Sequence, residues 1–249
     1  MKGPVEIAPG VHGLGSEYVN WYLVEEGDRL TAVDAGLPGF AKHLDEDLRA
    51  LGRHRSDVTA LVLTHSDADH TGVARDLQQA GARVLVHVDD EGTLRKPRLK
   101  TGDASPRNLL PYLRHGTPWR LLVHMGRQGG ARPPAVEGAE TYADGDVLDV
   151  PGSPRAVHTP GHTPGHCVLL FEGAGALFVG DALCTWNPLT GARGTQLMPF
   201  PLNVDNERCF ESLDRIEPLQ ASVVLPGHGD PVRESPAAAV AHARQMGRS

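Results

Sequence analysis

The sequence predicts an α/β protein, and three observations support this fold class. Apolar runs of the strand type alternate with segments of helical periodicity along most of the chain. Turns separate these elements, since 29 glycines and 20 prolines are spread along the sequence. The 249 residues are 40% hydrophobic and 22% charged, which is the balance of a globular protein with a sizeable core. No linker or repeat is evident, so we expect one domain over residues 1–249.

The first third of the chain is expected to contain strands, a helix, a further strand and a second helix. A helix is predicted over residues 40–51, because apolar side chains recur there at helical spacing before Gly52. Residues 58–63 form a nearly continuous apolar run, which is typical of a strand buried on both faces. The other elements predicted in this third are strands at residues 5–11, 22–24, 30–36 and 83–88 and a helix at residues 73–80.

A basic segment follows, and it differs from the rest of the chain. Residues 95–132 hold nine basic residues against one acidic residue, Asp103. We predict a helical insertion at about residues 92–135 that covers a site on the main body. Its charge either serves an anionic substrate or belongs to a solvated surface. The basic residues are Arg95, Lys96, Arg98, Lys100, Arg107, Arg114, Arg120, Arg127 and Arg132.

The strand pattern returns after Pro134. The elements expected in the last part of the chain are strands at residues 147–150, 156–158, 167–171, 176–179 and 222–225 and helices at residues 207–216 and 236–244.

Composition and charge argue against several classes of protein. The chain has 24 basic and 31 acidic residues, and a net charge of −7 disfavours a general nucleic-acid binder. No apolar run approaches the ~18 residues of a membrane span, and the first residues lack the apolar stretch of a signal peptide. Three widely spaced cysteines, Cys167, Cys184 and Cys209, fit a reducing cytoplasm better than a disulfide scaffold. We therefore expect a cytoplasmic protein that acts on a small molecule, with no nucleic acid or membrane partner and with a homodimer left open.

One stretch places four candidate metal ligands within six residues, directly after the predicted strand at residues 58–63. His65, Asp67 and Asp69 alternate, so in an extended segment they point to the same side. His70 begins the turn into the next helix and can point elsewhere. This arrangement suits two adjacent metal ions better than one, and imidazole together with carboxylate suits zinc, iron or manganese.

Three later turns repeat this design, each with a ligand-type residue beside glycine at the end of an apolar strand. Active sites gather at strand ends in α/β folds, and glycine lets the backbone approach an ion closely. The candidate residues at these turns are His162, Asp181 and His228.

These motifs, in this order, resemble those of the metallo-β-lactamase superfamily. The pattern of that family is T-H-x-H-x-D-H, then P-G-H-T-x-G-H, then G-D, and a terminal G-H. The corresponding segments here are residues 64–70, 160–166, 180–181 and 227–228. The resemblance spans about residues 5–230, and it implies a four-layer αββα sandwich in which helices flank two mixed β-sheets.

The resemblance also implies a centre of two divalent metal ions, with zinc as the first expectation and iron or manganese as alternatives. All but one of the family ligands have a counterpart in this chain. The counterparts are His65 and His162 for the first ion, Asp69, His70 and His228 for the second ion, and Asp181 as the carboxylate that bridges both.

Asp67 departs from the family pattern, which usually has a second histidine at this position. Aspartate can still bind the first ion, as a harder ligand whose negative charge admits iron or manganese. Alternatively, Asp67 does not ligate and water takes its place. We expect Asp34 to fix the turn at residues 33–36, and His166 to support the site without binding metal.

The function that the resemblance implies is a metal-dependent hydrolase. A metal-bridged hydroxide would attack an ester, lactone or thioester-type bond in a small molecule, and Asp69 would orient the water and take up its proton. A mononuclear iron dioxygenase acting on a persulfide or thiol, through His65, His162 and Asp181, is an alternative. A phosphodiesterase of the same superfamily and a non-enzymatic binding module on this fold also stay open.

Overall fold

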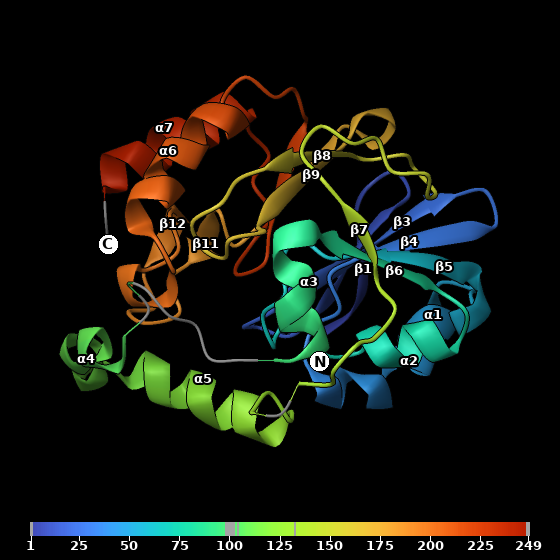
Figure 1. The fold of residues 1–249 in the computed structure, drawn as a ribbon, viewed down its shortest axis with the longest axis horizontal. Coiled ribbons are helices and arrows are strands. Elements are labelled where there is room, and N and C mark those ends of the chain that lie inside the picture. Colours follow the sequence, from blue (N-terminus) through green and yellow to red (C-terminus); the bar gives the residue numbers. More distant parts are fainter. Residues whose placement is uncertain (1, 98–102, 104, 132, 248–249) are drawn as a thin grey trace.

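The computed structural model of the chain describes residues 2–97, 103, 105–131 and 133–247. Figure 1 shows two β-sheets face to face, with helices on their outer sides. The described part of the chain holds no helix with the length and apolar character that a membrane span needs. Three of the predicted basic residues, Arg98, Lys100 and Arg132, lie outside the described residues.

The first sheet has seven strands in sequence order. Its first four strands pair antiparallel, whereas the fourth to seventh pair parallel, so the sheet is mixed. The strands are β1 (Lys2–Ala8), β2 (Val11–Gly15), β3 (Asn20–Glu26), β4 (Arg29–Val33), β5 (Val58–Val62), β6 (Arg83–His87) and β7 (Glu140–Tyr142).

The second sheet has four strands in the order β13-β10-β9-β8. It is also mixed, because β10 runs parallel to β13 and antiparallel to β9. Its strands are β8 (Arg155–His158), β9 (Cys167–Phe171), β10 (Ala176–Gly180) and β13 (Val223–Pro226). A separate hairpin consists of β11 (Cys184–Trp186) and β12 (Arg193–Gln196).

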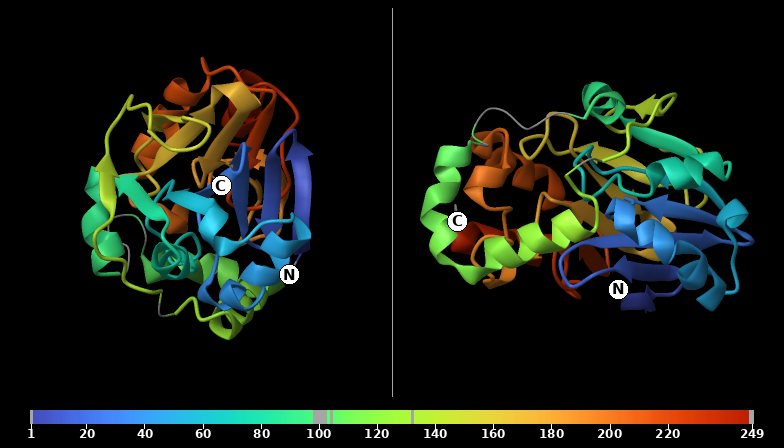
Figure 2. Two further views of the ribbon diagram at one scale, coloured as in Figure 1. Left: turned by 90° about the vertical axis from the view of Figure 1, so that its right-hand side faces the viewer. Right: turned by 90° about the horizontal axis from the view of Figure 1, so that it is seen from below.

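The helices cover the outer faces of the two sheets (Figures 1 and 2). On the first sheet lie α1 (Leu44–Ala50) and α2 (Ala74–Gln79), and α3 (Val88–Arg95) follows β6 directly. On the second sheet lie α6 (Asn206–Ile216) and α7 (Pro236–Met246). The short 3-10 helices are η1 (Pro38–Lys42), η2 (Arg55–Asp57), η3 (Leu110–Arg114), η4 (Glu172–Ala174) and η5 (Phe200–Leu202).

Alternating side chains explain why three apolar layers form. In β5, Ala60 and Val62 face the second sheet, whereas Leu61 faces α1 and α2. In β9, Leu169 faces the first sheet and Leu170 faces α6 and α7. Both strands are therefore buried on both faces, which is why their sequences are continuously apolar rather than alternating. The predicted α/β class and the αββα arrangement of two mixed sheets are confirmed.

Several predicted elements differ in detail. Residues 5–11 contain a turn rather than one strand, because Gly10 has φ +71° between β1 and β2. The helix expected over residues 40–51 is divided at His43 into η1 and α1. Residues 147–150 form one isolated bridge instead of a strand, and their apolar side chains Leu148 and Val150 are buried between the sheets without a ladder. The strand was predicted from apolar content alone, and a loop whose apolar side chains are buried has the same apolar content.

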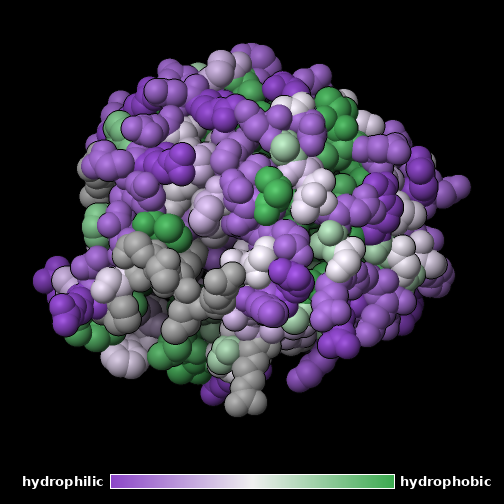
Figure 3. Space-filling view, in the orientation of Figure 1, coloured by the Kyte–Doolittle hydropathy of each residue, from purple (hydrophilic) through white to green (hydrophobic). Residues whose placement is uncertain are grey.

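The predicted basic insertion contains α4 (Pro106–Leu109), η3 and α5 (Gly116–Arg127), and Figure 1 shows it as an arm along the lower left of the molecule. None of the described side chains of α5 is buried. The arm contacts the main body through a few groups: the Gly39 amide donates to the Gln128 carbonyl at 2.8 Å, and the His124 and Tyr18 rings lie 4.8 Å apart. In Figure 3, hydrophobic residues gather at the surface over this arm.

Candidate metal centre

The seven side chains expected to hold metal lie together at one end of the sandwich. They come from four loops, each at the carboxyl end of a strand, where the two sheets meet. The loop after β5 supplies four of them, and the loops after β8, β10 and β13 supply one each. The seven are His65, Asp67, Asp69, His70, His162, Asp181 and His228.

The first group consists of His65, Asp67 and His162, whose ligand-type atoms lie within 4.8 Å of one another. The Oδ2 atom of Asp67 is 3.1 Å from Nε2 of His162 and 3.7 Å from Nε2 of His65. Asp67 therefore points towards the two histidines from the position that a third imidazole would occupy in the family pattern. Its side chain is 22% exposed, so this carboxylate also borders solvent.

The second group consists of Asp69, His70 and His228, again within 4.8 Å of one another. Oδ2 of Asp69 is 3.5 Å from Nε2 of His228. Both histidines are buried, whereas the Asp69 side chain is 16% exposed.

Asp181 lies between the two groups. Its Oδ2 atom is 3.2 Å from Nε2 of His162 in the first group and 3.3 Å from Nε2 of His228 in the second. Its Oδ1 atom is 3.4 Å from Nε2 of His70. One buried carboxylate therefore touches both groups, which is the position of a bridging ligand.

Three buried ligand-type atoms in this centre have no hydrogen-bond partner among the described residues. They are Nε2 of His65, Nε2 of His70 and Oδ1 of Asp181. A buried polar atom without a partner is costly, and divalent cations satisfy imidazole nitrogen and carboxylate oxygen together. The donor set of four imidazoles and three carboxylates therefore fits two such cations.

All four imidazoles present Nε2 to the centre because an oxygen atom holds Nδ1 on the other side. Carbonyl, carboxylate and amide oxygens only accept, and the Thr64 hydroxyl donates its own proton to Asp34 and so accepts from His65. We therefore infer that Nδ1 carries the proton and Nε2 the lone pair. The Nδ1 contacts are His65 to Thr64 Oγ1 at 2.9 Å, His70 to Asp34 Oδ2 at 2.9 Å, His162 to Asn203 Oδ1 at 2.9 Å and His228 to the Tyr18 carbonyl at 2.6 Å.

Asp34 does more than fix a turn. Its backbone has φ +59°, in the left-handed region, and such a conformation persists only when the surroundings hold it. The carboxylate accepts from the Thr64 amide at 2.8 Å and from the Thr64 hydroxyl at 2.9 Å, while it also contacts His70. Asp34 therefore links the end of β4 to both groups. It contacts Thr64, which precedes His65 of the first group, and it contacts His70 of the second group directly.

The carboxylates of the centre favour the protonated form of two neighbouring imidazoles. Burial disfavours the charged imidazole of His70, but Asp181 and Asp34 outweigh burial and raise its pKa to about 10. Burial opposes the charged form of His228 too, and Asp181 again raises its pKa above the ordinary value. Burial disfavours the Asp181 anion, yet the imidazoles of His228, His70 and His162 hold its pKa well below the usual range. Metal binding replaces protons at such a centre.

His166 supports the centre without facing it. Its Nε2 atom accepts from the Asp181 amide at 3.1 Å, and its Nδ1 atom lies 2.9 Å from the Thr159 hydroxyl. Burial lowers the pKa of His166 well below its ordinary value, so this imidazole is neutral and available as an acceptor. Cys184 is fully buried, and burial raises the pKa of its thiol, which makes it a poor nucleophile.

A further group, His87, Asp89 and His158, also has ligand-type atoms within 4.8 Å. The two rings stack with centroids 4.2 Å apart and planes 11° from parallel. An ion cannot lie in both ring planes of a parallel stack, as lone-pair ligation requires. Nε2 of His158 instead lies 2.8 Å from the Pro164 carbonyl.

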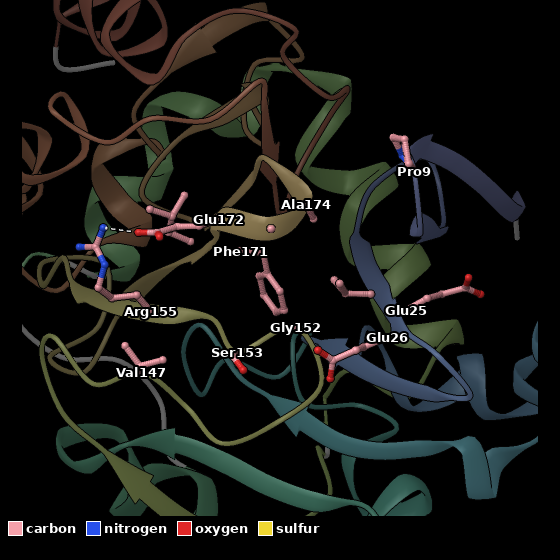
Figure 4. Close-up of a pocket in the computed structure, with 13 residues that line it drawn as sticks. Pro9, Glu25, Glu26, Val147, Gly152, Ser153, Arg155, Phe171, Glu172 and Ala174 are labelled. Atoms are coloured by element: carbon pink, nitrogen blue, oxygen red, sulfur yellow. Dashed lines mark hydrogen bonds and ion pairs between the residues drawn. The ribbon is translucent and has the colours of Figure 1, made fainter.

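A cavity of about 460 Å³ lies at the opposite end of the sandwich (Figure 4). Glu25, Glu26 and the Phe171 ring border it, and an ion pair of 3.1 Å joins Arg155 to Glu172 at its edge. None of the residues that line it is a histidine or a cysteine. The groups able to bind metal therefore gather at the other end of the strands.

The fold and the site together define a class of protein, a four-layer αββα sandwich with a histidine–carboxylate centre at the meeting edge of its sheets. A family model described as the metallo-β-lactamase superfamily matches residues 14–228, and the chain belongs to this superfamily. It is therefore an enzyme of the metallo-hydrolase type, in a superfamily whose members bind divalent metals, typically zinc.

Known relatives agree with this assignment. A probable metallo-hydrolase of Bacillus subtilis (strain 168), YqjP, is 31% identical over 226 residues, which cover 85% of this chain and 67% of YqjP. The thioesterase pkgB of Emericella nidulans is 25% identical over 87% of this chain and 47% of its own length. The crystal structure of the metallo-β-lactamase family protein TTHA1429 from Thermus thermophilus has a TM-score of 0.68 at 25% identity, and covers 97% of this chain and 79% of that chain.

Residues far away in the sequence complete the site. Asn203 and the Tyr18 carbonyl hold the ligand-type histidines His162 and His228, and no sequence motif marks them. The spacing of potential ligands cannot reveal partners of this kind, because their contacts depend on tertiary structure alone.

Proposed function

We propose that this protein is a hydrolase with two divalent cations, zinc in the first place, that cleaves an ester, lactone or thioester bond in a small molecule. The observation that carries the proposal is the position of Asp181, whose two oxygens lie 3.2–3.4 Å from imidazole nitrogens of both groups. Iron and manganese are the alternatives, because Asp67 adds a hard ligand to the first group.

Each group would hold one cation. His65, Asp67 and His162 would hold the first, Asp69, His70 and His228 the second, and Asp181 both. Such a pair of cations supplies a Lewis acid and lowers the pKa of water towards ~7, so that a nucleophile exists at neutral pH.

The exposed carboxylate of Asp69 takes the proton-handling role in this proposal. Among the second group it is the side chain that solvent reaches, whereas His70 and His228 are buried. An Asp69 oxygen accepts the proton of the attacking water and orients that water towards the substrate carbonyl. Asp34, Asn203 and the Tyr18 carbonyl keep the imidazoles in the tautomer that leaves Nε2 unprotonated.

We place the variable part of the substrate in a groove of about 510 Å³ beside α5. Tyr18, Trp119 and Val123 give it apolar walls, while Arg120 and Arg127 bring positive charge and Glu17 negative charge. The Tyr18 carbonyl contacts Nδ1 of His228 on the side of that ring away from the centre, so Tyr18 connects this groove to the second group. An acyl chain or thiol leaving group with an anionic end matches these walls. The thioesterase pkgB and an atrochrysone carboxyl ACP thioesterase of Aspergillus fumigatus among the relatives support a thioester.

We further propose that residues 1–249 act as one domain with the insertion at about residues 92–135, in the cytoplasm, on a small-molecule substrate without nucleic acid or membrane. All three cysteines are buried and lie outside any disulfide of the described residues, which supports a reducing compartment. Mass measurement in solution decides between a monomer and a homodimer.

Elemental analysis of protein purified without added metal tests the proposed chemistry first. We expect close to two zinc or manganese ions per chain and turnover of a thioester, ester or lactone in a substrate panel. Removal of metal by a chelator abolishes that turnover, and returning the metal restores it. About one iron ion per chain, together with oxygen consumption in the presence of thiols or persulfides, would instead show an oxygenase and overturn the proposal.

A further inference from the structure

A buried carboxylate outside the ligand set touches both loops of the first group. Asp90, the third residue of α3, is 1% exposed. Its Oδ2 atom accepts from the Ser66 amide at 2.9 Å and from the Thr163 hydroxyl at 2.8 Å, and its Oδ1 atom accepts from the Gly165 amide at 2.8 Å. Both carboxylate oxygens are therefore in use, on two segments far apart in the sequence.

Two of the three donors are adjacent to residues of the first group. Ser66 stands between His65 and Asp67, and Thr163 directly follows His162. A displacement of either donor moves the backbone of an adjacent ligand residue. By contrast, none of the three hydrogen bonds reaches Asp69, His70 or His228.

Gly165 allows this close contact. A Cβ atom at position 165 would lie 2.8 Å from the Cβ, Cγ and N atoms of Asp90, which is closer than real Cβ contacts. The glycine of the P-G-H-T-x-G-H segment therefore serves the approach of this loop to α3.

No ion pair of Asp90 occurs among the described residues, so neutral donors alone satisfy its charge. Hydrogen bonds to an ionised acceptor are short and roughly twice as strong as neutral ones. Asparagine has the same shape but cannot replace this group. The Ser66 and Gly165 amides each face a different oxygen, so the NH2 group of an asparagine side chain would oppose one of the two N–H groups.

We propose that Asp90 is a positioning residue that joins the loop of His65 and Asp67 to the loop of His162 and thereby sets the metal affinity of the first group, with little effect on the second. The inference rests on the proposed metal centre. It assigns Asp90 no contact with substrate or with metal.

The test is zinc affinity measured by competition with a chromophoric chelator, with each group isolated in turn. In a His228→Ala background the remaining site is the first group, and in a His162→Ala background it is the second. We expect Asp90→Asn to weaken zinc binding by about 10–100-fold in the first background, the range typical of residues that support ligands, and by less than about threefold in the second. Asp89→Asn is the matched control, because it removes the same charge from a neighbouring side chain that is 55% exposed.

Two further measurements keep the inference testable if Asp90→Asn folds poorly. Thr163→Val removes one of the three hydrogen bonds and leaves the carboxylate, so a smaller loss at the first group is expected. Hydrogen exchange of backbone amides in metal-free protein reports the hydrogen bonds of Asp90 in the absence of metal. We expect the Ser66 and Gly165 amides to exchange faster in Asp90→Asn.

Unchanged zinc affinity in both backgrounds, or an equal loss in both, would overturn the role of Asp90. Hydrolysis is a separate readout. A protein whose first-group affinity depends on Asp90 but which cleaves no ester, lactone or thioester would refute the proposed function and leave Asp90 in place. If the protein hydrolyses such a substrate but Asp90→Asn binds zinc like the wild type, the role of Asp90 would be refuted and the proposed function would stand.

Discussion

Gly227 gives the sharpest single test of the metal centre. It lies between β13 and His228, and it faces the side chains of Asp181 and His70. A Cβ atom added there would be 2.4 Å from Oδ1 of Asp181 and 2.5 Å from Cε1 of His70. Real Cβ atoms essentially never come closer than 3.0 Å, so Gly227→Ala must displace the carboxylate by about 0.6 Å and the imidazole by about 0.5 Å.

That displacement is large for a metal site, where ligand distances are held within about 0.2 Å. We therefore expect Gly227→Ala to lower zinc affinity at least about 100-fold, more than the loss of a supporting residue costs. Overpacking of this kind also destabilises the metal-free fold by about 1–3 kcal/mol. For a chain of this length that corresponds to a fall in Tm of roughly 2–12 °C.

The assay compares chelator competition and thermal unfolding, with and without zinc, for Gly227→Ala and Gly173→Ala. Gly173 is the control because an added Cβ there meets nothing within 4 Å and its φ is not in the left-handed region. Zinc should raise the Tm of the wild type and of Gly173→Ala, but raise that of Gly227→Ala much less. If Gly227→Ala binds zinc as tightly as the wild type, Asp181 and His70 do not form the centre described above.

Three other substitutions probe separate parts of the molecule. Asp181→Asn keeps the shape but removes the charge shared by both groups, so metal content and kcat/KM should fall more than about 100-fold; full metal content and full turnover would remove Asp181 from the site. Gly126 lies in α5, and an added Cβ there meets nothing within 4 Å. Gly126→Ala should therefore raise the free energy of unfolding, measured by denaturant titration, by about 0.5–1 kcal/mol. A loss of stability would contradict the helical geometry of this segment. Arg120→Gln should raise KM for an anionic substrate without changing kcat, and it should flatten the salt dependence of KM. Arg114→Gln is the control because Arg114 does not line the groove. Equal effects of the two substitutions would refute a local contact of Arg120 with the substrate.

Much of the candidate site was predictable from the sequence because its ligands lie in short motifs. The alternation of His65 and Asp67 correctly predicted that these two side chains lie in one group. Asp69 was expected on the same side, but residues 68–70 form a turn rather than an extended segment, so Asp69 lies with His70 in the second group. The structure brings these residues together with His162, as the order of the motifs implied. Local geometry of this kind depends on residues that are neighbours in the chain.

The supporting residues were not predictable in the same way. Asn203 reaches His162 from 41 residues away, and the Tyr18 carbonyl reaches His228 across 210 residues. A backbone carbonyl carries no sequence signal at all. The strand expected at residues 147–150 failed for a related reason, because Leu148 and Val150 fill the space between the sheets while their backbone pairs only at one bridge.

The distribution of ligands along the chain has a consequence for synthesis on the ribosome. The first group needs residues up to His162, whereas the second also needs His228. Four of the proposed ligands, in the loop of residues 65–70, are translated long before either group is complete. If the two groups bind metal as proposed, their selectivity would depend on residues that are translated last, and an ion bound earlier would meet an incomplete set of ligands.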